Sequence, residues 1–283
     1  MDSLDGFVAY DNLVRDILQQ RGIAVDEISW RANDVDWSLY DMVVIRSPWD
    51  YQHAPDDFLR VLATIDASRA SLQNSLEIVQ WNVQKTYLRL LDEAGVTIVP
   101  TQWLNSPSTT ELRAMFESLG SDDIVIKPVV GANADNAFWL RPGSPAELLQ
   151  TVEQVFRNRI ALAQPFVSSV TSYGEVSLMF FNGEYSHSVL KTPKSGDFRV
   201  QEEHGGQIQS IEPDRELIEF ARRSLISVPG ETLYARVDVV YLADVQPAIM
   251  ELELIEPSLY VSFDAKAPGR FADVIEDFLK RLR

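Results

Sequence analysis

Cysteine is absent from this chain of 283 residues, and histidine occurs only three times. The lack of cysteine excludes disulfides, thiol nucleophiles and cysteine-based metal sites, and it is typical of proteins in a reducing cytoplasm. His53, His187 and His204 lie in different segments, so a histidine-rich metal site is not expected. The chain also lacks a basic, then apolar, amino terminus and any run of about 18 apolar residues, so neither a signal peptide nor a membrane span is predicted.

Positive charge is scarce: 25 basic residues stand against 42 acidic ones, which gives a net charge of −17. Such a protein should be repelled by nucleic acid and by anionic membranes, so neither is expected as a partner. The need for solubility is enough to explain this negative charge. A polyanionic ligand would bind only with the help of local cations or a metal ion. With 46% hydrophobic and 24% charged residues the chain can bury a sizeable core, and its length allows two or three small domains.

Short signatures of common enzyme classes are missing as well. The chain has no GxxxxGK(S/T) phosphate loop, no GxGxxG dinucleotide fingerprint, no HExxH zinc helix and no GxSxG nucleophile elbow. A function therefore has to be inferred from side chains that lie on several different elements.

The first third of the chain alternates strand and helix patterns, which predicts an α/β domain with a parallel sheet. In chain order the patterns predict a helix at 11–21, strands at 25–30 and 41–47, and a helix at 55–65. Residues 1–11 contain no convincing strand, although a βαβ domain normally opens with one. We therefore expect that Met1 is an internal or trimmed start and that the first strand lies outside this sequence.

The rest of the chain mixes helices and strands in an α+β pattern. Residues 81–95 read as one amphipathic helix, and Ser108 and Ser144 each begin a capping-box pattern before a further helix. Asn182-Gly183 predicts the turn of a hairpin. The last third adds strands at 233–242 and 248–256 and a closing helix at 273–283.

Carboxylates alternate with apolar residues in the strand AIMELELIEP, residues 248–257. Glu251 and Glu253 should face the same side, roughly 7 Å apart, because side chains alternate along a strand. Asp238 and Arg236 alternate in the same way in YARVDVVYL, where a simple ion pair or a solvated face is the competing explanation. If the two strands are neighbours, they present three carboxylates together, a set of hard oxygen ligands that suits Mg²⁺ or Mn²⁺.

Lys127 interrupts the otherwise apolar strand DIVIKPVV. A charge inside such a run is costly unless it reaches an anion or water. Two interpretations remain open: a lysine that snorkels to solvent, and a phosphate ligand that projects into a cleft. Pro128 predicts that this strand lies at a sheet edge or ends there. Lys85, in the first turns of the helix predicted at 81–95, carries no signal by itself.

Eight segments in a fixed order resemble the ATP-grasp superfamily, which includes glutathione synthetase and D-alanine–D-alanine ligase. They are VVIRSPWDY, WNVQKTYLRLL, DIVIKPVVG, QPFV, GEVSLMFFNGEYSHSVLK, GDFRVQEEHGG, RVDVVYL and MELELIEPSLY. The resemblance covers almost the whole chain and points to the bacterial branch that contains the D-cycloserine-forming ligase. It implies an ATP-grasp fold in three parts, with ATP held between the last two: an N-terminal α/β domain at 1–78, a central ATP-grasp subdomain at 79–166 and a C-terminal subdomain with a metal site at 167–283.

The resemblance also assigns ATP contacts to matching positions. These are the phosphate-binding Lys85 and Lys127, the hinge residues Gln164, Phe166 and Val167 beside the adenine, and the ribose-binding Glu175. Backbone groups of Phe166 and Val167 are expected to read the edge of the adenine. The loop GANADNAF after Lys127 would cover the phosphates, although it has one glycine where several relatives have more.

For the chemistry, the resemblance implies metal ligands, an arginine and two backbone amides. Asp238, Glu251 and Glu253 match the magnesium ligands, and Glu253 stands where many relatives have asparagine. The remaining matches are Arg199, which would steady the transferred phosphoryl group or the acyl intermediate, and the amides of Gly205 and Gly206, which would approach the same oxygens.

Substrate contacts are expected from the loop RSPWDYQH, because such loops face the substrate in this superfamily. Arg46, Trp49 and Asp50 are therefore substrate candidates, and the alternative is a loop that Trp49 and Tyr51 simply pack in place. Lys191 is a further candidate for binding an anion.

Together these features imply an ATP-dependent ligase that uses Mg²⁺, with two ions expected and Mn²⁺ as a substitute. It would phosphorylate a small amino-acid-like carboxylate to an acyl phosphate, which an amine or another nucleophile then attacks. Alternatives are a phosphotransferase that stops after phosphoryl transfer and a nucleotide- or metal-binding protein without turnover. The joint presence of both lysines, Arg199 and the three carboxylates argues against the last. Homodimers are common among relatives, and the sequence leaves the oligomeric state, the acceptor and the nucleophile open.

Overall fold

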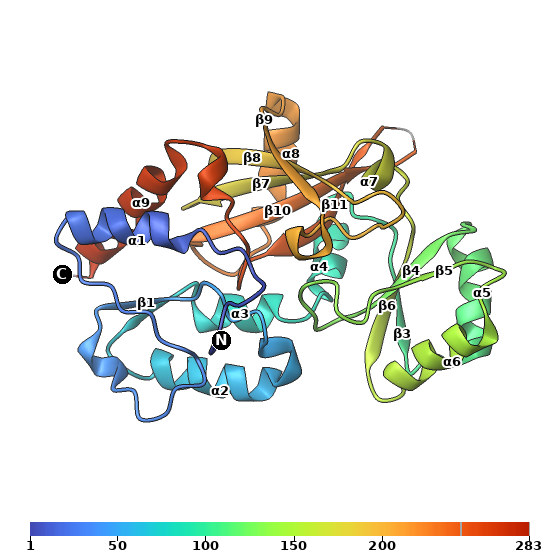
Figure 1. Ribbon diagram of the computed structural model, residues 1–283, viewed down its shortest axis with the longest axis horizontal. Coiled ribbons are helices and arrows are strands. Elements are labelled where there is room, and N and C mark those ends of the chain that lie inside the picture. The colour runs from blue at the N-terminus through green and yellow to red at the C-terminus, as the bar shows by residue number, and fades with distance from the viewer. Residues whose placement is uncertain (244, 283) are drawn as a thin grey trace.

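The computed structural model describes residues 1–243 and 245–282. Within them, strands form a two-stranded parallel sheet of order β1-β2, a four-stranded sheet of order β3-β6-β4-β5 and a five-stranded sheet of order β11-β10-β7-β8-β9. Figure 1 shows the four-stranded sheet in a lobe of its own at the right, beside the body built on the five-stranded sheet. The mixture of helices and sheets confirms the predicted α/β (α+β) class.

The N-terminal part contains α1 (Asp11–Gln20), β1 (Met42–Val44), α2 (Pro55–Asp66), β2 (Ser71–Gln73) and α3 (Leu76–Asn82), with short 3-10 turns at Trp37–Leu39 and Tyr51–His53. The strand predicted at 25–30 does not form. The sheet of this part consists of β1 and β2. Residues 25–30 are held instead by the ring of Trp30, which packs edge-on against Phe58 at a centroid distance of 5.4 Å. Residues 1–10 form no strand.

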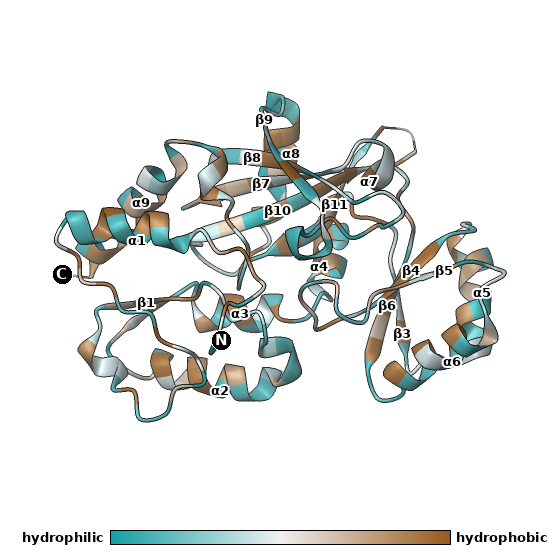
Figure 2. Ribbon diagram, in the orientation of Figure 1, coloured by the Kyte–Doolittle hydropathy of each residue, from teal (hydrophilic) through white to brown (hydrophobic). Residues whose placement is uncertain are grey.

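The central part contains α4 (Tyr87–Glu93), β3 (Gln102–Asn105), α5 (Thr109–Leu119), β4 (Ile124–Pro128), β5 (Phe138–Leu140), α6 (Ala146–Val155) and β6 (Ile160–Pro165). In Figure 2, α5 and α6 alternate brown and teal, which is typical of helices that bury one face against a sheet. The capping box at Ser108 is confirmed. The capping box predicted at Ser144 is wrong. The Ser144 hydroxyl accepts from the amide of Arg141, and the N-cap residue of α6 is Pro145.

The helix predicted at 81–95 is interrupted. Its residues are divided between α3 and α4, and Lys85 lies in the turn between them. The Lys85 amide donates to the carbonyl of Val129 at 2.8 Å, so the backbone bonds across to the end of β4 rather than along a helix. Pro128 is the last residue of β4, which confirms that this strand ends there.

The C-terminal part contains α7 (Ser169–Ser172), β7 (Glu175–Phe181), β8 (Glu184–Thr192), β9 (Gln207–Ile211), α8 (Arg215–Leu225), β10 (Tyr234–Tyr241), β11 (Pro247–Glu253) and α9 (Ala267–Arg281), with 3-10 turns at Glu202–His204 and Val261–Phe263. The hairpin at Asn182-Gly183 is confirmed, since it joins the antiparallel β7 and β8. Helix α1 packs on α9, which ties the two ends of the chain together. None of the helices described here is both long and apolar enough to cross a membrane.

The five-stranded sheet has one apolar face and a second face that packs partly on α9 and carries charged side chains in its remaining part. Val237 and Leu252 belong to a buried cluster that also holds Phe220 of α8, so this helix covers the apolar face. Residues directly opposite one another on paired strands share a face. The register of β10 and β11 places Asp238 opposite Glu251, so their carboxylates share the other face.

The outer edge of β11 is held by side chains from the preceding segment. The Asn82 amide group donates to the carbonyl of Leu252 at 2.9 Å and accepts from the amide of Leu254 at 3.0 Å. The Tyr87 hydroxyl accepts from the amide of Leu252 at 2.9 Å. These bonds satisfy an edge that would otherwise be open, and they fix the strand that carries the two glutamates.

Candidate active site

A cavity of about 180 Å³ is bounded by residues of the four-stranded sheet, the five-stranded sheet and the loops between them. It brings together most of the predicted site residues: Trp49, Lys85, Lys127, Gln164, Phe166, Val167, Glu175, Lys191, Arg199, Asp238, Glu251 and Glu253. Arg46, Asp50, Gly205 and Gly206 do not line it.

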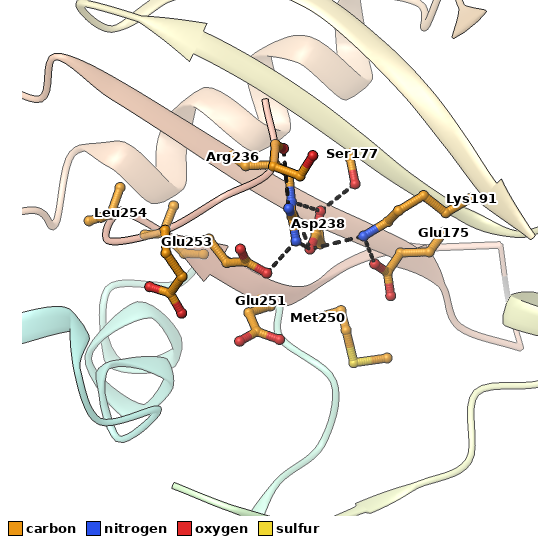
Figure 3. Close-up of polar contacts among 12 residues, drawn as sticks. Glu175, Ser177, Lys191, Arg236, Asp238, Met250, Glu251, Glu253 and Leu254 are labelled. Carbon is orange, nitrogen blue, oxygen red and sulfur yellow. Dashed lines mark hydrogen bonds and ion pairs between the residues drawn. The ribbon is translucent and has the colours of Figure 1, made fainter. Parts of the chain in front are cut away.

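Asp238 lies at the centre of the charged sheet face (Figure 3). It accepts from the hydroxyl of Ser177 on β7 at 2.5 Å and from Nε of Arg236 at 3.0 Å, and Lys191 Nζ approaches at 3.3 Å. Burial alone would raise the pKa of Asp238, but Arg236 and Lys191 outweigh it and hold the pKa well below its usual range. Asp238 is therefore a fixed negative charge.

Glu251 faces two lysines from other parts of the chain. Its carboxylate pairs with Lys85 Nζ at 2.5 Å, and that ammonium also donates to the carbonyl of Gly131 at 2.9 Å. Burial works to lower the pKa of Lys85, but Glu251 more than compensates and the pKa is raised. Among the described residues, Lys127 Nζ has only the thioether of Met250 within hydrogen-bonding distance, at 3.8 Å. Burial lowers the pKa of Lys127, against the attraction of Glu251. Lys127 is thus a buried lysine without an ion-pair partner in the part of the chain that the structure describes.

Glu253 forms an ion pair with Arg236, the residue opposite it on β10. Burial raises the pKa of Glu253 to about 7: the attraction of Arg236 opposes this rise, and repulsion from Glu251 and Asp238 adds to it. The carboxylates of the charged face therefore repel one another at Glu253, and a bound cation would relieve this repulsion.

A divalent ion fits the chemistry of this donor set, although the carboxylates are not gathered around one point. Within residues 1–243 and 245–282 no three His, Cys, Asp or Glu side chains are placed to hold a metal. The reason is that Lys85 and Arg236 lie against Glu251 and Glu253. All the donors are carboxylate oxygens, which Mg²⁺ prefers, and a cation would relieve the repulsion between them. Asp238, Glu251 and Glu253 remain predicted ligands.

The opposite end of the cavity is aromatic and built on β6. Gln164 is buried and donates to the hydroxyl of Thr101 at 2.9 Å. The amide of Phe166 is already used, because it donates to the carbonyl of Asp123 at 2.7 Å. Across the described residues, the Val167 amide has no hydrogen-bond acceptor. Of the two backbone amides predicted to read an adenine, only that of Val167 is free to do so.

Trp139 of β5 packs behind this aromatic end, without lining the cavity itself, and was not predicted. Its ring stacks on Phe166 at a centroid distance of 4.5 Å, and Phe198 meets it edge-on at 5.7 Å. Its Nε1 donates to the side chain of Asp123 at 2.8 Å. No local pattern in the sequence indicates this role, because it depends on the pairing of β5 with β4.

Glu175 and Lys191 face each other on paired strands and form a buried ion pair at 2.5 Å. Burial opposes the charged form of Lys191, but Asp238 and Glu175 raise its pKa well above the usual range. Glu175, which was predicted to bind ribose hydroxyls, therefore presents a carboxylate already oriented by a lysine. Lys191, which was predicted with less support, is part of the cavity floor.

The loop at 193–206 carries the predicted arginine and glycines. Arg199 lines the cavity and pairs with Asp197 at 2.7 Å. The amides of Gly205 and Gly206 donate to carbonyls of the loop itself, at 2.8 and 3.0 Å, so they are not available to a ligand here. A Cβ at Gly206 would lie 2.1 Å from the carbonyl oxygen of Val200, which explains why glycine is needed.

The N-terminal loop expected to face a substrate is largely packed. Asp50 accepts from Trp30 Nε1 and Arg31 Nε, both at 2.7 Å, and lies away from the cavity. Arg46 pairs with Asp11 at 2.9 Å and lines a separate, smaller pocket. Trp49 lines both pockets. Only Trp49 of the three candidates therefore reaches the main cavity.

Two buried charged residues that line the cavity, Arg236 and Glu256, were not assigned to the site. Arg236 was interpreted only as a possible partner of Asp238, although the strand alternation already placed both on one face. Glu256 lines the cavity but follows the end of β11, so no strand period could place it. Both are buried.

Comparison with known proteins identifies the family. The D-cycloserine synthetase DcsG N-terminal domain family matches residues 1–74, and the prokaryotic glutathione synthetase ATP-grasp domain family matches residues 94–240, which is 147 of the 283 residues. The cycloserine biosynthesis protein DcsG of Streptomyces lavendulae is 28% identical over 271 residues, which cover 92% of this chain and 90% of that protein.

Solved structures agree with this assignment. The crystal structure of D-cycloserine synthetase DcsG matches with a TM-score of 0.84 and 26% identity, over 96% of this chain and 94% of that chain. D-alanine–D-alanine ligase from Bacillus anthracis shares the fold, with a TM-score of 0.67 and 16% identity over 96% of this chain and 91% of that one. The chain therefore belongs to the ATP-grasp ligases, in the family of the prokaryotic glutathione synthetase ATP-grasp domain, and it is an ATP-dependent enzyme of the carboxylate–amine (C–N bond-forming) ligase class.

Proposed function

We propose that this ligase activates a small amino-acid-like carboxylate as an acyl phosphate and then passes the acyl group to an amine or another small nucleophile. The observation that carries this proposal is the composition of the cavity. One end is aromatic with a free backbone amide at Val167, and the other gathers Lys85 and Lys127 beside Asp238, Glu251 and Glu253. Such a site suits a nucleotide whose base lies at the aromatic end and whose phosphates lie among the charges.

Two lysines and a metal ion would each contact the phosphates of ATP. Lys127 has no ion-pair partner among the residues that the structure describes and is positioned to donate to a phosphate oxygen. Lys85 would exchange part of its contact with Glu251 for another phosphate oxygen. Mg²⁺ held by Asp238, Glu251 and Glu253 would neutralise charge on the phosphates. These cations explain how a protein with a net charge of −17 binds a polyanion.

The proposed reaction has two displacements. A carboxylate oxygen of the substrate attacks the γ-phosphorus of ATP, and the bond to the β-phosphate oxygen breaks to release ADP. The amine nitrogen then attacks the carbonyl carbon of the acyl phosphate, and phosphate leaves. Arg199, at the cavity wall, and Arg236, beneath it, would stabilise the charge that develops on the phosphoryl oxygens. The contribution of the protein is positioning and electrostatic stabilisation, and no covalent protein intermediate is needed.

Three loops meet over the cavity and would keep water from the acyl phosphate. His204 Nε2 lies 3.1 Å from the carbonyl oxygen of Asn133, and the Asn133 side chain donates to the carbonyl of Trp49 at 3.2 Å. The Tyr10 hydroxyl donates to the carboxylate of Glu202 at 3.1 Å. These contacts join the phosphate-covering loop, the arginine loop and the N-terminal loop, which is the arrangement that protects a reactive intermediate.

Calorimetric titration with a non-hydrolysable ATP analogue, with and without Mg²⁺, tests the nucleotide site. We expect binding that depends on Mg²⁺ and that weakens at least about tenfold in Lys127→Ala, because a charge-assisted hydrogen bond to phosphate is lost. Lys266→Ala, which removes an exposed lysine near the start of α9, is the matched control and should bind as the wild type does. No binding by the wild type with Mg²⁺ would refute the proposed site.

The aromatic end gives a second prediction. Trp139→Ala should weaken binding of the same analogue by about two- to tenfold, because its ring supports Phe166 and Phe198, which line the cavity. Trp37→Ala, in the N-terminal part and away from the cavity, should leave binding unchanged. Equal affinity of Trp139→Ala and wild type in the titration would place the base elsewhere.

A further inference from the structure

We propose that Glu256 is the subsite for a substrate ammonium group, so that the enzyme selects carboxylates that also carry a free amine. This inference rests on the proposed function, since it concerns the second ligand of the same cavity. Its basis is a buried carboxylate that lines the cavity and forms no ion pair with the residues that the structure describes.

Glu256 is held rigidly at the cavity wall. It is 8% exposed and lies three residues beyond the end of the strand that carries Glu251 and Glu253. Its carbonyl accepts from Trp49 Nε1 at 2.8 Å, and the next carbonyl, that of Pro257, accepts from Arg46 at 2.9 Å. The N-terminal loop therefore fixes the backbone on which this carboxylate stands.

The carboxylate of Glu256 differs from the others that form the cavity floor. Glu175, Asp238, Glu251 and Glu253 each form an ion pair with a lysine or arginine: Glu175 with Lys191, Asp238 with Lys191 and Arg236, Glu251 with Lys85, and Glu253 with Arg236. Glu256 forms no ion pair with any residue that the structure describes, and its hydrogen-bonding neighbour is the buried hydroxyl of Tyr51. A phenol can donate one hydrogen bond but brings no positive charge.

The electrostatic consequence favours a cationic ligand. Burial and then repulsion from Glu253 raise the pKa of Glu256 to about 8, and the attraction of Lys85 offsets only part of this rise. A buried carboxylate is costly unless it is paired, so an ammonium group at contact distance would be favoured there. A hydroxyl or methyl group in the same place offers no charge. The subsite therefore discriminates an amino acid from the corresponding hydroxy acid.

The test is saturation-transfer NMR on the protein without nucleotide, with a panel of D- and L-amino acids and their 2-hydroxy acid counterparts. In the wild type we expect binding of at least one amino acid, at least about tenfold tighter than its hydroxy counterpart. Glu256→Gln should remove this preference while leaving the weak binding of the hydroxy acid unchanged. Glu203→Gln, which neutralises an exposed glutamate at the rim of the same cavity, should retain the preference.

Further measurements separate this inference from the alternatives. Glu256→Asp keeps the negative charge on a shorter side chain and should retain part of the preference for the amino acid over the hydroxy acid. Thermal unfolding of each variant shows whether the fold is retained. Glu256→Gln should still bind the ATP analogue with Mg²⁺; loss of that binding would make Glu256 a metal ligand and overturn the inference. A preference that persists in Glu256→Gln, or no amino-acid binding by the wild type, would also overturn it. The proposed nucleotide site is tested separately, because only absence of binding of the ATP analogue to the wild type with Mg²⁺ would refute it.

Discussion

Replacing Glu251 with glutamine is expected to lower the rate of ATP turnover by about three orders of magnitude, at the upper end of what removal of one group that stabilises transition-state charge costs. Glutamine preserves the shape of the side chain but removes the charge that pairs with Lys85. It also removes a predicted ligand for Mg²⁺, so two of the groups proposed to hold the phosphates are disturbed by one change. Release of ADP in a coupled assay at saturating Mg²⁺ gives the rate.

The control for this experiment is Glu117→Gln, which removes an exposed carboxylate on α5 and should turn over ATP at the wild-type rate. Thermal unfolding of both variants shows whether the fold is retained. If Glu251→Gln were folded and retained turnover within tenfold of the wild type, the charged sheet face would not be the reaction centre.

The largest effect on stability is expected for Asn74→Ala. Asn74 is fully buried, and its side chain donates to the carbonyls of Tyr234 and Leu254, at 3.0 and 2.7 Å, and accepts from the amide of Leu233 at 2.7 Å. Alanine leaves these three backbone groups unpaired in the interior. Since each buried unpaired group costs about 1–3 kcal/mol, we expect the free energy of unfolding to fall by about 3–5 kcal/mol.

Urea unfolding of Asn74→Ala, compared with the wild type, measures this loss. Asn105→Ala changes an exposed asparagine of β3 and should stay within about 0.5 kcal/mol of the wild type. A loss below about 1 kcal/mol for Asn74→Ala would mean that water replaces the missing bonds, and that this asparagine does not fasten the N-terminal part to the five-stranded sheet.

The sequence predicted the charged sheet face because that face depends on a local rule. Side chains alternate along a strand, so Glu251 and Glu253 had to share a side, as did Arg236 and Asp238. The turn at Asn182-Gly183 and the capping box at Ser108 are equally local, and both were confirmed. The class of fold followed from the order of such elements.

What the sequence could not predict depends on contacts between distant segments. The helix expected at 81–95 is interrupted because Asn82 bonds to β11 and the amide of Lys85 bonds to Val129. Trp139 supports the cavity residue Phe166 only because its strand pairs with β4. Glu256 follows the end of β11, where strand alternation no longer applies. No single-segment pattern carries this information.

The most direct test of the proposed acyl phosphate is to follow the oxygen atoms of the substrate. The wild-type enzyme is incubated with ATP, Mg²⁺ and the amino acid that gives the fastest ADP release, labelled with oxygen-18 in its carboxyl group. If the carboxylate attacks the γ-phosphorus and phosphate later leaves the acyl carbon, one labelled oxygen should appear in inorganic phosphate. Unlabelled phosphate formed together with product would contradict the mechanism. Accumulation of a phosphorylated substrate without free phosphate would instead identify a phosphotransferase.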